Sequence, residues 1–165
     1  HNAIVKALAQ VIHKTDGAKV HLERRESELA RIFKGRVQQG QMDLAVAQYG
    51  THTKYIDATV VSPVTADPRF VLEAANKPGL AATKAEGLKR LRYPHASLPP
   101  FAMEIGGRLG PSALAYVQSL FREPGASADY TIADALTSLS TALHAHTAQQ
   151  IYTAQLSTPA PNPAS

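Results

Sequence analysis

The sequence predicts an α/β (α+β) fold, in which helices flank a small mixed β-sheet. Three observations support this fold class. Helical and strand-like apolar patterns alternate along the chain. The strand candidates are short, and glycine or proline residues bound most of them. The length of 165 residues and the hydrophobic fraction of 44% suit one globular domain.

The first half of the chain predicts one helix and three strands. Apolar residues recur on one helical face and predict a helix over residues 2–14. An alternating pattern predicts a short strand over 19–23. Two apolar runs, 42–47 and 55–61, predict further strands, and the Tyr49-Gly50 connection between them predicts an antiparallel hairpin.

Residues 67–93 predict two helical stretches that separate at Lys77-Pro78-Gly79. The second stretch contains an apolar stripe, which we expect to pack on the sheet because such stripes normally face the core. The stripe consists of Ala81, Ala85, Leu88 and Leu91.

The last part of the chain predicts a strand over 101–105 and two more helices. Pro111 suits the first turn of a helix, whose apolar stripe is formed by Leu114, Val117, Leu120 and Phe121. Thr131 and Asp134 have the spacing of a capping box and open a helix that runs to about Tyr152. We therefore expect one domain over 1–152 and a Pro-rich disordered tail over 153–165.

Composition excludes several classes of function. A chain without cysteine has no disulfide, thiolate zinc site, iron–sulfur cluster or cysteine nucleophile. No apolar run approaches a membrane span, so we expect no membrane partner. The net charge of +4 permits a polyanionic partner without demanding one. The chain begins at His1, which predicts a fragment or a processed product.

Two acidic residues stand inside apolar strand runs. Asp43 and Asp57 are separated by thirteen residues, which is enough for one strand, a short loop and half a strand. In a hairpin this spacing can set the two carboxylates side by side, where they repel each other unless a cation lies between them. Mg²⁺ prefers one or two carboxylates together with water and phosphate oxygens. If the two acids share one Mg²⁺, we expect their nearest oxygens within about 5 Å.

The same pair also has ordinary interpretations. Strand aspartates often face solvent, accept hydrogen bonds from a neighbouring loop or pair with an arginine. The metal interpretation gains weight because no other constellation in the sequence competes with it: there is no G-x-S-x-G motif and no pair of histidines at metal-ligand spacing.

Four segments together resemble the restriction-enzyme-like endonuclease domain of non-LTR retrotransposon reverse transcriptase proteins, a branch of the PD-(D/E)XK nuclease superfamily. The resemblance covers residues 1–123, and the opening residues 1–4 are similar to the start of the helix that follows a zinc knuckle in such polyproteins. The four segments are Met42-Asp43-Leu44, Ile56-Asp57-Ala58-Thr59-Val60-Val61, Glu86-Gly87-Leu88-Lys89-Arg90-Leu91-Arg92-Tyr93 and Pro100-Phe101-Ala102-Met103-Glu104.

The resemblance implies a PD-(D/E)XK nuclease-like core followed by C-terminal helices, and an endonuclease that nicks target DNA for retrotransposon insertion. It implies that Asp43 and Asp57 hold Mg²⁺ or Mn²⁺. Thr59 stands where the superfamily usually has lysine, and Met42 replaces the motif proline. In the retrotransposon branch the lysine is displaced to the next helix, and Lys89 matches that position. The implied partners are DNA and the reverse transcriptase region of the same polyprotein, and the implied location is the nucleus.

Further residues are candidates for accessory roles. Glu104 is a candidate to contact Lys89, a backbone amide or the metal shell, or instead to brace a helix terminus or loop. Tyr93 and Glu23 are further accessory candidates, and a surface role is the simpler explanation of Glu23. The candidate DNA-binding residues, for which a solvated basic face is the alternative, are Lys84, Arg90, Arg92, Lys34 and Arg36.

One loop is a second candidate for phosphate binding. Residues 106–110 are glycine-rich and precede a predicted helix start, where backbone amides can hold a phosphate. A plain turn is the more common explanation of such a segment.

Three functions therefore remain open. The leading interpretation is a metal-dependent DNA endonuclease. The second is a catalytically inactive nucleic-acid-binding domain of the same fold, and the third is a structural scaffold module without a ligand.

Overall fold

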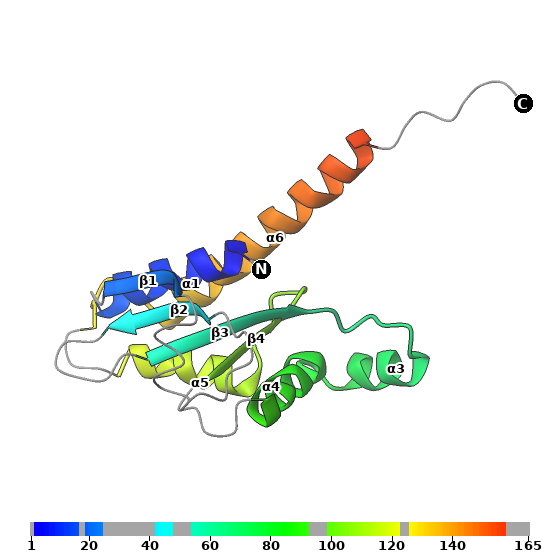
Figure 1. Ribbon diagram of the computed structural model, residues 1–165, viewed down its shortest axis with the longest axis horizontal. Coiled ribbons are helices and arrows are strands. Elements are labelled where there is room, and N and C mark those ends of the chain that lie inside the picture. Colours follow the sequence, from blue (N-terminus) through cyan, green and yellow to red (C-terminus); the bar gives the residue numbers. More distant parts are fainter. Residues whose placement is uncertain are drawn as a thin grey trace, which may run out of the picture.

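The computed structural model describes residues 2–16, 19–24, 42–47, 54–92, 99–122 and 126–157 (Figure 1). Within these ranges the chain has a mixed α/β architecture, as predicted. Its elements are α1 (Asn2–Asp16), β1 (Lys19–Arg24), β2 (Met42–Ala47), β3 (Lys54–Val61), α3 (Pro68–Asn76), α4 (Leu80–Arg92), β4 (Pro100–Glu104), α5 (Pro111–Leu120) and α6 (Ile132–Ser157).

The four described strands form one mixed sheet in the order β1-β2-β3-β4. Strands β1, β2 and β3 are successive antiparallel neighbours, which confirms the predicted hairpin. Strand β4 pairs with β3 in parallel, so the chain runs through α3 and α4 back to the edge of the sheet at which β3 begins. Ser62 and Pro63 follow the end of β3, because proline cannot continue a ladder of backbone hydrogen bonds.

One face of the sheet forms the main hydrophobic core. Leu44 of β2, Ile56 of β3 and Phe101 of β4 are each at most 1% exposed and point to this face. The apolar faces of α1 and α5 pack against them, and α6 packs on α1 and α5 to close the same core. Because side chains alternate along a strand, the residues between them, including Asp57, face the other side.

Helix α4 covers part of this second face, over β3 and β4. The predicted stripe of α4 is wrong in part, since Leu88 and Leu91 are 68% and 78% exposed. The helix instead buries Ala81, Ala82 and Glu86. The charged Glu86 takes a core position because its hydrogen bonds, described below, offset the cost of burial.

The end of β4 and the buried face of α5 also differ from the sequence predictions. Strand β4 ends at Glu104, and Ile105 lies exposed in the following turn. Helix α5 is rotated relative to its predicted stripe, so that Leu114 is exposed while Ala113, Tyr116, Val117 and Leu120 are buried.

The capping box at the start of α6 is confirmed. Asp134 Oδ2 accepts hydrogen bonds from the hydroxyl and the backbone N–H of Thr131, at 2.7 and 2.9 Å, and these bonds lower the pKa of the Asp134 carboxyl. The helix continues to Ser157, beyond the predicted end near Tyr152, and projects away from the sheet (Figure 1). The first residues of the predicted tail are therefore helical, and residues 158–165 lie outside the described part.

No helix in the described ranges is long and apolar enough to cross a lipid bilayer.

A buried carboxylate joins α4 to the start of α5. Gly110, the N-cap of α5, has no side chain with which to cap the helix. Glu86 supplies the missing acceptors: its Oε2 and Oε1 accept the backbone N–H groups of Ser112 and Ala113, both at 2.9 Å. Glu86 is only 1% exposed. A negative charge at this point is also favoured by the dipole of α5.

We predict that Gly110→Ala lowers the free energy of unfolding by about 1–3 kcal/mol, the cost of disturbing a buried hydrogen-bonded group. A Cβ on Gly110 would lie 2.6 Å from Cδ of Glu86. Gly106→Ala is the matched control, because a Cβ there meets no atom within 4 Å, and it should change stability by at most about 0.5 kcal/mol. Urea denaturation measures both variants. Equal stabilities would show that the Glu86 contact is not structurally important.

Candidate active site

Strands β2 and β3 separate at the position of Asp43. The described ladder pairs Val46 with Lys54, Ala45 with Tyr55 and Leu44 with Ile56, and Asp43 and Asp57 are the next residues on the two strands. Beyond the paired residues, the side chain of Asp43 contacts β3, since its Oδ2 accepts the N–H of Ala58 at 2.7 Å. The Asp43 carboxylate therefore lies against the backbone directly after Asp57.

Asp57 forms an ion pair with Lys89. The distance from Lys89 Nζ to Asp57 Oδ2 is 2.5 Å, and the two side chains are 15% and 19% exposed. The contact joins the sheet to α4 across the second face. It brings together three residues that the sequence analysis selected from separate segments: Asp57 and Lys89 through their ion pair, and Asp43 through the neighbouring amide.

The position of Lys89 follows from the buried face of α4. Ala82, Glu86 and Lys89 are spaced by four and three residues, which places them on one side of the helix. Ala82 and Glu86 are buried, so the Lys89 stem begins at the same contact and its ammonium reaches Asp57. The stripe predicted from the sequence, with Leu88 and Leu91, would have turned a different side of α4 toward the sheet.

Glu104 contacts a backbone amide at the start of α4. Its Oε1 accepts the N–H of Ala81 at 3.0 Å, and the residue is 8% exposed. Of the roles considered from sequence, this is the contact with a backbone amide at a helix terminus. Glu104 thus fixes the first turn of α4, while Glu86 fixes its middle.

Glu86 is the residue whose role the sequence analysis did not identify. Its signal was its spacing from Ala82 and Lys89, together with a downstream helix start at Gly110-Pro111 that has no capping side chain. This contact also bears on whether the glycine-rich loop before α5 can bind a phosphate. The amides of Ser112 and Ala113 already donate to Glu86, so this helix start offers them to the protein's own carboxylate rather than to a phosphate.

The donors of the site are consistent with a magnesium ion. Asp43 and Asp57 carry carboxylate oxygens on neighbouring strands, and Mg²⁺ needs only one or two carboxylates when water and phosphate complete its shell. Among the described residues no group of three or more histidine, aspartate or glutamate side chains could hold a metal ion.

The basic candidates on α4 lie in different surroundings. Lys84 is 54% exposed and extends to α3, where it lies 3.7 Å from Glu73 and over the Phe70 ring. Arg90 is exposed and donates to the Ser112 hydroxyl, and Arg92 is exposed at the end of the helix. Tyr93, Lys34, Arg36 and the side chain of Glu23 lie outside the described part of the structure.

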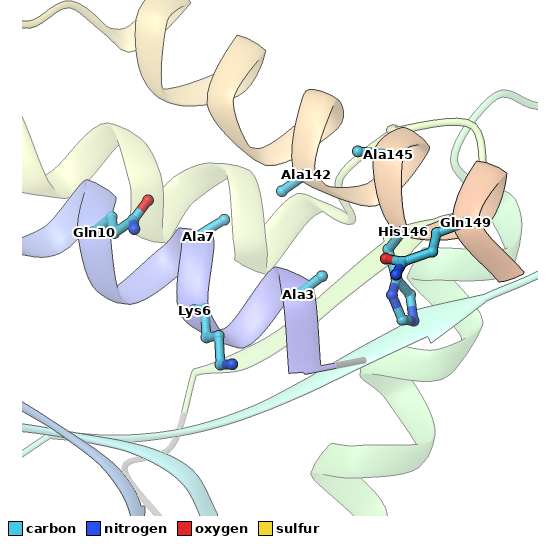
Figure 2. A pocket seen from close by; sticks show the side chains of 8 residues that line it. All are labelled: Ala3, Lys6, Ala7, Gln10, Ala142, Ala145, His146 and Gln149. Atoms are coloured by element: carbon cyan, nitrogen blue, oxygen red, sulfur yellow. The ribbon is translucent and has the colours of Figure 1, made fainter.

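A shallow groove on the other face of the sheet is unsuited to metal binding. It has a volume of about 310 Å³ and lies between α1 and α6 (Figure 2). Its lining consists of Ala3, Lys6, Ala7, Gln10, Ala142, Ala145, His146 and Gln149, without a carboxylate. The groove is therefore separate from the acidic pair in both position and chemistry.

Comparison with known proteins gives no assignment: no family model matches the chain, and no curated protein is significantly similar to it.

We predict that Glu104→Ala lowers the free energy of unfolding by about 0.5–2 kcal/mol, the usual cost of losing a helix-capping acceptor. Glu104→Gln should lose less, because its amide oxygen can still accept the Ala81 N–H. Urea denaturation and hydrogen exchange of the Ala81 amide measure the effect. An unchanged exchange rate in Glu104→Ala would contradict the capping role.

Proposed function

We propose that this domain is a Mg²⁺-dependent DNA endonuclease of the PD-(D/E)XK superfamily, which nicks target DNA for insertion of a non-LTR retrotransposon. In this proposal Asp43 and Asp57 hold the metal ion, and Lys89 stabilises the charge that develops at the scissile phosphate. The reverse transcriptase region of the same polyprotein is the proposed partner, and the nucleus is the proposed location.

The observation that carries the proposal is the contact between Lys89 and Asp57. The resemblance implies a lysine displaced from the strand to the next helix, at the position of Lys89. The 2.5 Å distance between Lys89 Nζ and Asp57 Oδ2 supports this assignment. A lysine that served only as a solvated surface charge would be far more exposed, whereas the Lys89 side chain is 15% exposed.

The residues of the chain divide the proposed chemistry between them. A bound Mg²⁺ supplies Lewis acidity and activates water for attack on the phosphodiester. Asp43 and Asp57 orient the cation from two strands that the sheet holds rigid. Lys89 has a flexible stem and a compact charge, so it can follow the phosphate as charge builds on it. Arg90 and Arg92 extend the positive charge of α4 for contacts with the DNA backbone.

The inactive nucleic-acid-binding domain remains the second candidate. It is favoured by Thr59, which leaves β3 without the usual lysine, and by the ion pair, which already neutralises one of the two acids. The two candidates differ in whether DNA is cleaved, while both bind it.

We predict that Asp43→Ala and Asp57→Ala each abolish nicking of supercoiled plasmid DNA in Mg²⁺, because both remove a ligand of the same cation. Asp67→Ala is the matched control. That carboxylate caps α3 by accepting the Arg69 N–H at 2.9 Å, and it lies on the exposed surface. Circular dichroism verifies folding of each variant. Nicking that persists in either site variant, or in excess EDTA, would exclude the mechanism and leave DNA binding alone.

We predict that Lys89→Ala lowers the nicking rate at saturating Mg²⁺ by about 10²-fold or more, the scale of losing one transition-state charge contact. Lys84→Ala lies on the same helix but extends to α3. It should weaken DNA binding only modestly, and this effect should diminish as salt rises. Single-turnover rates at several salt concentrations separate the two. Equal, salt-dependent losses in both variants would reduce Lys89 to one member of a basic face.

A further inference from the structure

The acidic site already contains a cation of the protein's own. Lys89 Nζ lies 2.5 Å from Oδ2 of Asp57, one of the two oxygens that this carboxylate can offer. Asp43 precedes the paired residue Leu44 on β2, and its carboxylate accepts the N–H of Ala58, the residue directly after Asp57. Two acids in this arrangement repel each other, and the ammonium offsets that repulsion.

The ammonium and a metal ion would compete for the same acid. A divalent cation that engages Asp57 meets the positive charge of Lys89 at a mostly enclosed position, where Coulomb interactions are stronger than in water. The lysine has the means to leave, because its four-carbon stem rotates freely about several bonds. The acidic pair has no such freedom, because both residues belong to strands of the sheet.

We propose that Lys89 is the resident counter-ion of the acidic pair and gives up its contact with Asp57 when a divalent cation binds. Metal loading then frees the ammonium for the substrate phosphate, so the lysine becomes available only in a loaded site. This inference rests on the proposed function, since it takes Asp43 and Asp57 as the metal ligands. It adds that Lys89 opposes metal binding instead of assisting it.

The direct test is the affinity for Mn²⁺, measured from the electron paramagnetic resonance signal of the free ion without DNA. Lys89→Met keeps the apolar stem but removes the positive charge. The variant should bind Mn²⁺ about tenfold more tightly than the wild type, because a positive charge so close to the site weakens the binding of a cation. Lys84→Met on the same helix is the matched control and should stay within about twofold of the wild type. Equal or weaker binding by Lys89→Met overturns the proposal.

A second measurement needs no metal. In EDTA, Lys89→Met removes the ammonium that pairs with Asp57 and should lower the thermal midpoint by about 2–4 °C. Adding Asp57→Asn to Lys89→Met removes the repulsion and should restore the midpoint. An unchanged midpoint in Lys89→Met, or no recovery in the double variant, overturns the counter-ion role.

The two proposals fail in different ways. If the wild type binds Mn²⁺ and Asp57→Asn does not, the metal site is supported, and the Mn²⁺ affinity of Lys89→Met alone tests the counter-ion role of Lys89. If the wild type shows no saturable Mn²⁺ binding, both the metal-dependent nuclease and the counter-ion role are contradicted.

Discussion

The buried carboxylate of Glu86 determines where α4 lies, and the rest of the site depends on that position. A carboxylate that is 1% exposed is costly unless strong hydrogen bonds satisfy it. The amides of Ser112 and Ala113 provide them, so α4 and α5 can pack closely only in the register that brings Glu86 to the start of α5. Glu104 adds a second constraint at the first turn of α4. Lys89, one turn beyond Glu86, is thereby directed at the sheet.

Because side chains alternate along the strands, the apolar core and the acidic residue Asp57 lie on opposite faces of the sheet. Leu44 and Ile56 belong to the apolar face that α1 and α5 cover, while Asp57 belongs to the face that α4 covers in part. A shift of one residue in the β2–β3 register would exchange these faces and bury the acids in the core. The hydrophobic pattern that stabilises the fold therefore also fixes the side on which the acidic pair lies.

Much of this arrangement could be predicted from sequence, because it depends on local patterns. The short apolar runs located the strands, Pro111 located the start of α5, and Thr131 with Asp134 located that of α6. The face of α4 could not be predicted this way. Hydrophobicity predicted that Leu88 and Leu91 would face the sheet, yet Glu86 is the buried residue. The burial of Glu86 is stabilised by hydrogen bonds from amides about 26 residues further along the chain. Only tertiary contacts decide between a leucine and a hydrogen-bonded carboxylate at such a position.

In the proposed nuclease the lysine lies on a helix and not on the strand of Asp57, and this changes what the position of the lysine depends on. A lysine at position 59 would share the rigid strand of Asp57, and its place relative to the acids would be fixed by β3 alone. Lys89 instead reaches Asp57 from an element that is attached through Glu86 and Glu104. Its alignment therefore depends on how α4 packs against α5 and β4. Such a site can adjust its lysine without disturbing the strands that carry the acids, because the two parts belong to different layers of the fold.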